Sequence, residues 1–182
     1  MPRTATAVLV LGFVAGGLAK KGWNAFQPQL ELLAKRRSED ELLAHYSGGV
    51  SGATMADVRA AAEYAEATTP DVAMVLTWGR PVAINVLAGR RAPTRFINTY
   101  MLEAARPPFA LADAWARELE QAFASAPPAL VVVATPNAEG TALGGDDPSP
   151  AERVVQTALE TRYRFDRPFG SLEVYRLAEG AE

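Results

Sequence analysis

The chain has 182 residues, of which 49% are apolar and 21% charged, and its formal net charge is -3. This length and composition predict a folded chain with one domain of ordinary size and exclude a second large domain. Because the chain has no Cys and a single His, His45, disulfides, thiolate metal sites, a Cys nucleophile and any site with two imidazoles are excluded.

The charge is divided unevenly along the chain. Residues 1–37, the head, hold six basic residues and one acidic residue, which gives them a charge of +5. The rest of the chain has 12 basic and 20 acidic residues, a charge of -8. A body this acidic does not favour nucleic-acid binding, and we expect no nucleic-acid partner.

The head contains an uncharged, mostly apolar segment, residues 5–19, between Arg3 and Lys20. As a helix it would span about 22 Å, which is short of the roughly 30 Å hydrocarbon core of a bilayer. Three interpretations stay open: a signal peptide, the end of a transmembrane helix whose first part is absent, and a short membrane anchor. A buried core segment is disfavoured because three glycines weaken it as a soluble helix.

Residues 23–45 carry apolar residues at roughly helical spacing among Lys, Arg and Glu, which predicts an amphipathic helix. Its aromatic pair, Trp23 and Phe26, suits a helix in the headgroup region of a membrane, but the pattern fits a helix packed on the body equally well. The Gly- and Ser-rich run 47–52 predicts a flexible joint. The expected organisation is an apolar membrane- or signal-like segment over 1–22, an amphipathic helix and joint over 23–52, and a soluble domain over 53–182.

Two capping boxes predict helix starts in the soluble domain. Thr54 with Asp57 opens the first helix, and Ser149 with Glu152 opens the last, where Pro150 stands at the first helical position. The elements predicted between and after them are a strand over 71–78, a helix over 82–88, a strand over 94–100, a helix over 111–123, a strand over 129–134, and a closing hairpin of 163–165 with 172–177 around a turn at 166–170.

The apolar runs 71–78 and 129–134 are nearly continuous, which is typical of strands buried on both faces of a parallel sheet. Strands that alternate with helices before a final hairpin predict an α/β fold. We therefore expect a three-layer sandwich with a mixed, mainly parallel sheet, preceded by the apolar segment and the amphipathic helix.

Arginines after the first predicted strand form the best candidate binding site. Residues 80–106 hold five arginines and one acidic residue. Guanidinium groups near a strand end bind phosphate or carboxylate through paired hydrogen bonds, although these arginines would equally suit solvation or pairing with the acids of the body. Ligands of α/β folds bind at the carboxyl ends of parallel strands. The expected ligand-binding residues are Trp78, Gly79, Arg80, Arg90 and Arg95.

The sequence predicts no catalytic set, metal site or cofactor. His45 lies beside the joint and outside the predicted sheet, which disfavours a Ser-His-Asp arrangement. The turn after the first strand has neither a Gly-rich loop nor a Walker-type Lys-Ser/Thr pair. Asp146 and Asp147 are interpreted as part of a turn rather than as ligands of a cation.

One segment resembles a known family. Its motifs are Trp78-Gly79 at a strand end, Leu87-Ala88-Gly89-Arg90 after a helix, and Pro93-Thr94-Arg95-Phe96. These motifs look like those in the C-terminal soluble domain of bacterial membrane glycosyltransferases, which are related to the protein O-mannosyltransferases and the aminoarabinose transferases. The resemblance covers about residues 54–177, and the head would correspond to the end of the last membrane helix.

The resemblance implies a role beside a membrane enzyme. Members of that family hold their acidic catalytic residue in a membrane domain that this chain lacks, so the chain alone would be non-catalytic. It implies an accessory domain of, or fragment from, a transferase that uses polyprenyl-phosphate-linked sugars, with its soluble part in the periplasm or another extracytoplasmic space. The basic residues after the apolar segment favour the opposite orientation. The alternative is a free-standing soluble module, exported or cytoplasmic, that binds a small anion.

Overall fold

The computed structural model divides into two compact units, residues 1–45 and 46–182. It describes residues 27, 31, 33–36, 38 and 41 of the first unit, and residues 53–79, 81, 83–96, 99, 102, 109–134, 143, 147–178 and 180 of the second. The apolar segment 5–19 and the joint 47–52 lie outside the described residues. None of the helices within the described ranges is long and apolar enough to span a bilayer.

The described residues of the first unit lie within the range of the predicted amphipathic helix, 23–45, and include a turn. Gln27 and Glu31 are helical, but a turn follows in which Lys35 has a φ of 56°. Beyond the turn, the Ser38 amide donates to the Glu41 carboxylate at 2.8 Å, and the Glu41 amide donates to the Ser38 hydroxyl at 3.2 Å. This reciprocal pair of hydrogen bonds between Ser38 and Glu41 has the pattern of a capping box.

In the second unit, α3 (Met55–Thr68) begins at the predicted capping box. The Asp57 amide donates to the Thr54 hydroxyl at 3.1 Å, and the Thr54 amide donates to the Asp57 carboxylate at 2.8 Å. These bonds satisfy amide groups that have no partner inside the helix. The predicted apolar face is confirmed, since its four residues are buried: Val58, Ala61, Ala62 and Ala65.

A short strand and a short helix follow. β1 (Val75–Trp78) is buried at every position, but it is shorter than predicted because the Ala73 amide closes a turn onto the Pro70 carbonyl at 2.9 Å. α4 (Ala83–Leu87) ends before Gly89, whose φ of 61° is the left-handed conformation that terminates helices.

The next helix and strand agree with their predictions. α6 (Ala112–Ser125) buries Leu119 and Phe123, two residues of its predicted apolar face. β2 (Leu130–Ala134) is buried at all five positions, as its continuous apolar sequence requires.

The C-terminal part consists of α7 (Pro150–Arg162), β3 (Tyr163–Phe169) and β4 (Leu172–Leu177). α7 has the predicted capping box, in which the Glu152 amide donates to the Ser149 hydroxyl at 3.1 Å. The hairpin is confirmed, but its turn is tighter than the predicted 166–170, because β3 continues to Phe169. A bulge near Asp166 lets the strand continue past that residue.

The sheet has the strand order β1-β2-β4-β3. β1 and β2 are parallel, with Val75 opposite Leu130, whereas β4 runs antiparallel to both β2 and β3. The sheet is therefore mixed, as expected, but the expectation that it is mainly parallel was wrong. The physical reason is that β4 enters between β2 and β3 and so makes two antiparallel pairs.

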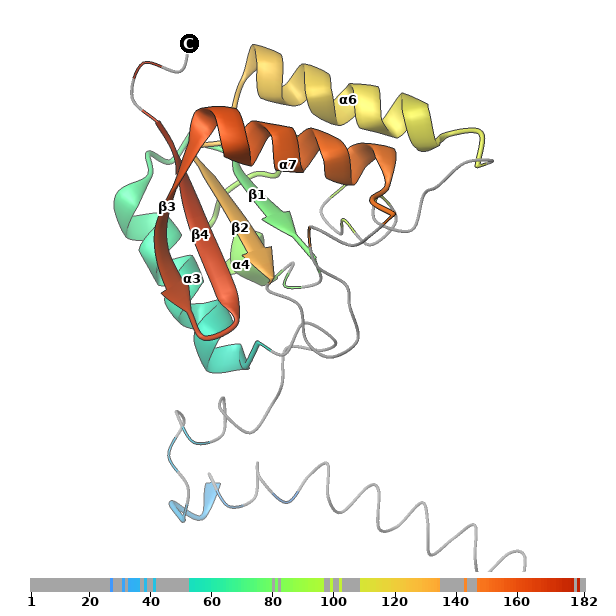
Figure 1. The fold of residues 1–182 in the computed structure, drawn as a ribbon. Coiled ribbons are helices and arrows are strands. Elements are labelled where there is room, and N and C mark those ends of the chain that lie inside the picture. The colour runs from blue at the N-terminus through green and yellow to red at the C-terminus, as the bar shows by residue number, and fades with distance from the viewer. Residues whose placement is uncertain are drawn as a thin grey trace, which may run out of the picture. The chain divides into compact units, whose positions relative to one another are not determined.

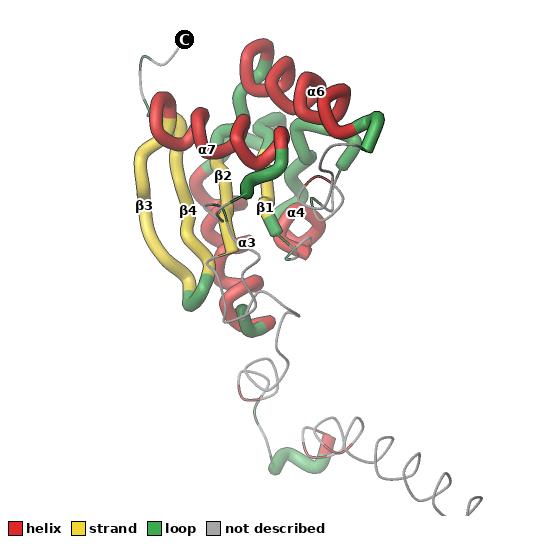
Figure 2. Tube along the Cα trace, turned by 45° about the vertical axis from the view of Figure 1, so that its right-hand side comes forward, coloured by secondary structure: helices red, strands yellow, loops and turns green. Residues whose placement is uncertain are grey.

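Two apolar cores cover the two faces of the sheet. α3 and α4 pack on one face, where the core includes Val132 and Val174, and α6 and α7 pack on the other, where it includes Val131 and Val133. Figure 1 shows these helix layers on opposite sides of the sheet, and Figure 2 shows the strands between them from a second direction. The second unit is thus an α/β sandwich of three layers.

The strand predicted over 94–100 is not formed in its described part. Thr94 and Arg95 lie in a bend, and the Phe96 amide donates to the Thr94 hydroxyl at 3.2 Å. The aromatic side chain of Phe96 instead packs against Trp115 of α6, with ring centroids 5.1 Å apart. A local turn and a contact with a helix have replaced the pairing that the alternating sequence suggested.

Candidate functional site

The corner after β1 is closed by packing. Trp78 is 1% exposed, and its indole Nε1 is buried without a hydrogen-bond partner among the described residues. The Gly79 amide donates to the Thr99 hydroxyl at 2.8 Å, and that hydroxyl donates back to the Gly79 carbonyl at 3.1 Å. A Cβ on Gly79 would lie 3.0 Å from Cβ of Ala134. Trp78 and Gly79 therefore hold the corner together, and Arg80 lies outside the described residues.

Arg90 is a buried clamp between α3 and α4. Its Nη2 donates to the carbonyls of Glu66 and Thr69, at 3.0 and 2.8 Å, and its Nη1 donates to the Ala88 carbonyl at 3.0 Å. Its Nε donates to the Thr69 hydroxyl at 3.0 Å. A cation at the C-terminal end of a helix is favourable both as a hydrogen-bond donor and by charge. Four of the five N–H donors are engaged in this way, so Arg90 serves the fold.

Asn85 joins β1 to the loop that carries Arg90. Its amide nitrogen donates to the carbonyls of Val75 and Arg90, at 2.8 and 3.3 Å, and its amide oxygen accepts from the Thr77 hydroxyl at 2.7 Å. All of these groups belong to a buried environment, where an unpaired polar group is costly. The network holds Arg90 near the amino end of β1.

Of the five predicted ligand-binding residues, the four that the structure describes lie at two different ends of β1. The Val75 amide donates to the Arg91 carbonyl at 3.0 Å, which places the arginines after Gly89 at the amino end of β1. Trp78 and Gly79 lie at the carboxyl end of the same strand. The residues expected at one corner therefore lie at two ends of β1: the carboxyl end is packed, and the amino end is lined by arginines.

The arginine-lined end borders a hollow of about 340 Å³. Two of its arginines, Arg91 and Arg95, are exposed. The Arg95 guanidinium lies 3.1 Å from the Glu118 carboxylate and 5.0 Å from the centre of the Phe96 ring, so it is partly held in place. The hollow is lined by Asn85, Val86, Arg90, Arg91, Ala92, Thr94 and Arg95. This arrangement suits a phosphate or carboxylate group.

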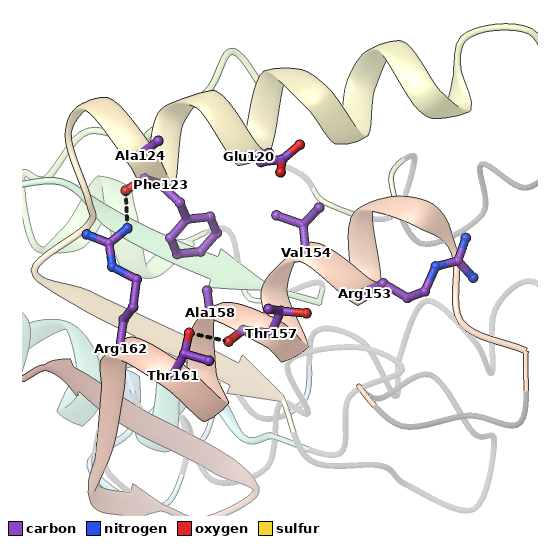
Figure 3. Close-up of a pocket in the computed structure, with 9 residues that line it drawn as sticks. All are labelled: Glu120, Phe123, Ala124, Arg153, Val154, Thr157, Ala158, Thr161 and Arg162. Carbon is purple, nitrogen blue, oxygen red and sulfur yellow. Dashed lines mark hydrogen bonds between the residues drawn. The ribbon is translucent and has the colours of Figure 1, made fainter. Parts of the chain in front are cut away.

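A second hollow, of about 330 Å³, lies between α6 and α7, and sequence reasoning did not find it. Figure 3 shows Phe123, Val154 and Ala158 in it, with Glu120 and Arg153 among the polar residues around it. Arg162 donates to the Phe123 carbonyl at 2.6 Å and so joins the ends of the two helices. The only sequence signal was that both helices are amphipathic, which does not say where their packing leaves a gap.

A polar cluster ties α3 to the hairpin. The Tyr64 hydroxyl donates to the Asp166 carboxylate, which also accepts from Nε of Arg176 at 3.2 Å. Arg176 Nη2 donates to the Tyr64 hydroxyl at 2.9 Å, and the Arg167 guanidinium lies 4.3 Å from the centre of the Tyr64 ring. Partial burial favours a higher pKa for Asp166, but these hydrogen bonds and the two arginine charges outweigh it and lower the pKa below its ordinary value of 3.8. The carboxylate is thus fixed in its charged form.

No family model, curated protein or solved structure matches the chain. Within the described ranges, no three His, Asp or Glu side chains are grouped so that they would hold a metal ion. The fold and the hollows define an α/β domain of three layers with an arginine-lined surface at the amino end of β1.

Proposed function

We propose that the chain is a non-catalytic accessory domain of a membrane glycosyltransferase that uses polyprenyl-phosphate-linked sugars. The observation that carries the proposal is the role of the residues on which the resemblance rests. Gly79 and Gly89 have positive φ, and Arg90 clamps two helices, so these motifs fix the shape of the domain. Residues that fix the shape of a domain suit an accessory role, because the work of such a domain is to position surfaces beside another catalytic centre.

In this proposal the soluble domain lies outside the cytoplasm, at the membrane, and covers the active site of a polytopic partner. The head supplies attachment to the bilayer, and its apolar segment of 15 residues supports that role. Arg95, the exposed one of the described arginines in the family motifs, is the residue available to an anionic group of the lipid-linked donor.

Transfer measured in isolated membranes tests the proposal. Membranes from the natural host, with and without the gene for this chain, receive a labelled sugar on polyprenyl phosphate and an extract of endogenous acceptors. We expect transfer to fall without the chain and to return when the full chain is expressed again. Equal transfer in both membranes, with the chain absent from the membrane fraction, would contradict the proposal.

The alternative is a free-standing module that binds a small anion, and the arginine-lined hollow is the observation that favours it. Calorimetric titration of the full chain with inorganic phosphate separates the two functions. Saturable binding that Arg91→Gln weakens, in a chain that stays out of the membrane fraction, would support the alternative. The absence of measurable heat would remove it.

A further inference from the structure

The hollow at the amino end of β1 combines one exposed aliphatic side chain with arginines. Val86 and Leu87, on the outer side of α4, are 75% and 51% exposed. Val86 lines the hollow together with Arg91 and Arg95. Single exposed aliphatic residues are ordinary, but here Val86 borders a cationic hollow and the next residue, Leu87, is exposed as well. We call Val86, Leu87, Arg91 and Arg95 the α4 surface.

The two outer arginines are available to a phosphate. Arg91 is exposed, and its guanidinium has no hydrogen-bond or ion-pair partner in the described part of the chain. Arg95 pairs with Glu118, but the arginine side chain is 67% exposed, and exposed pairs contribute little stability, so a phosphate readily replaces the carboxylate. Arg90 keeps its role as a clamp.

Two acidic residues limit the charge of this region. Asp71 is fully exposed and lies 3.4 Å from Arg90, and Glu118 faces Arg95. Against these, Arg90, Arg91 and Arg95 leave a net charge of +1 in a domain whose overall charge is negative. The α4 surface is therefore a local cationic site on an acidic body, which orients the body toward a negatively charged surface.

We propose that the α4 surface docks on a membrane whose lipids carry anionic phosphate headgroups. Arg91 and Arg95 bind the headgroup phosphates, and Val86 and Leu87 enter the boundary between headgroups and acyl chains. Charge complementarity favours the headgroups, and the exposed aliphatic pair favours a lipid surface over a free phosphate, which would leave both side chains in water. The inference rests on the membrane location in the proposed function. It does not require a transferase partner.

A single fluorescent label tests the docking, because the chain has no Cys that would compete for the label. Val86→Cys in the full chain receives an environment-sensitive fluorophore. The matched control is Glu160→Cys, an exposed position on α7, which covers the opposite face of the sheet. Both proteins are mixed with phosphatidylcholine vesicles with and without phosphatidylglycerol. We expect a blue shift of the label at 86, and none at 160, on the phosphatidylglycerol vesicles alone.

Charge variants of the labelled protein separate docking from damage to the fold. Arg91→Gln and Arg95→Gln should each weaken the apparent vesicle affinity of the label at 86 by about fivefold, the effect expected of one basic residue at an anionic surface. Glu118→Gln should strengthen it, because Arg95 then loses its competing carboxylate. Because damage to the fold would weaken docking, a higher vesicle affinity of the Glu118→Gln variant would not come from misfolding.

Four results would overturn the proposal. The first is that the labels at 86 and 160 respond alike, and the second is that neutral vesicles shift the label at 86 as much as anionic vesicles do. The third is that inorganic phosphate alone reproduces the blue shift, which would make the hollow a free-anion site. If the chain sediments with vesicles while the label at 86 stays in water, the head is the membrane contact. That result ends the docking proposal and leaves the proposed function standing.

Discussion

Arg90 and Thr69 are joined by two hydrogen bonds. Nη2 of Arg90 donates to the Thr69 carbonyl at 2.8 Å, and Nε donates to the Thr69 hydroxyl at 3.0 Å. Thr69 is the C-cap residue directly after α3, so one guanidinium fixes the end of this helix against the loop after α4.

Arg90→Met should lower the free energy of unfolding by about 3 kcal/mol, because it leaves buried carbonyl groups without donors. Arg90→Lys should recover less than half of this loss, since an ammonium group lacks the planar fork of a guanidinium. Urea unfolding measures both. The control is the exposed neighbour in Arg91→Met, which we expect to change stability by less than about 0.5 kcal/mol. Equal losses at the two positions would refute the clamp.

Asn85→Leu should destabilise the domain by about 3 kcal/mol, because the carbonyl of Val75 loses a buried donor and the Thr77 hydroxyl loses its acceptor. Thr77→Val removes one bond of the same network and should cost about 1 kcal/mol. The double variant should cost less than the sum of the two, since they share a bond. Strict additivity in urea unfolding would show that the network does not act as a unit.

Gly79 and Gly89 form a matched pair with different surroundings. Gly89→Ala should cost about 1 kcal/mol, because its φ of 61° is left-handed and nothing lies within 4 Å of the added Cβ. Gly79→Ala should cost about 3 kcal/mol, because its φ of 105° is less accessible and the new Cβ meets Ala134. Thermal unfolding compares them. Ala134→Gly should rescue part of the loss at 79 and none of the loss at 89; rescue of both would contradict this account.

Asp166→Asn should destabilise the domain by about 2 kcal/mol at neutral pH, since it weakens hydrogen bonds to Tyr64 and Arg176. The folded pKa of Asp166 lies below 3.8, so its stabilisation is complete above the unfolded pKa and is lost as the pH falls through the folded pKa. The difference between wild type and variant should therefore shrink as the pH falls below about 4. Urea unfolding across this range, with Tyr64→Phe as a variant of intermediate pH dependence, checks it. A stability difference between wild type and variant that does not vary with pH would exclude the lowered pKa of Asp166 as its cause.

Local signals predicted local structure well. Both capping boxes are confirmed because Thr54 and Ser149 each need only a carboxylate three residues away. β2 is confirmed because its apolar sequence leaves no solvent-facing side. The strand predicted at 94–100 failed where it is described: Phe96 packs on Trp115 of α6 and does not pair in the sheet.

The candidate site depended on contacts between distant residues. Arg90 was predicted to bind a ligand because guanidinium groups near strand ends do so, and nothing in the sequence indicates that the carbonyls of Glu66 and Thr69 face it. The hollow between α6 and α7 was missed for the same reason. A pattern of charges identifies arginines that are close along the chain, but only the fold decides which of them keep free donors.

The position of β4 has a consequence for how the protein is made. This strand comes last in chain order, yet it pairs with both β2 and β3. While the ribosome is still adding residues 172–177, β2 has an open edge and its apolar faces lack one neighbour. We therefore expect the nascent domain to complete its folding only after Leu177 has left the exit tunnel, and to be exposed to aggregation or chaperone capture until then.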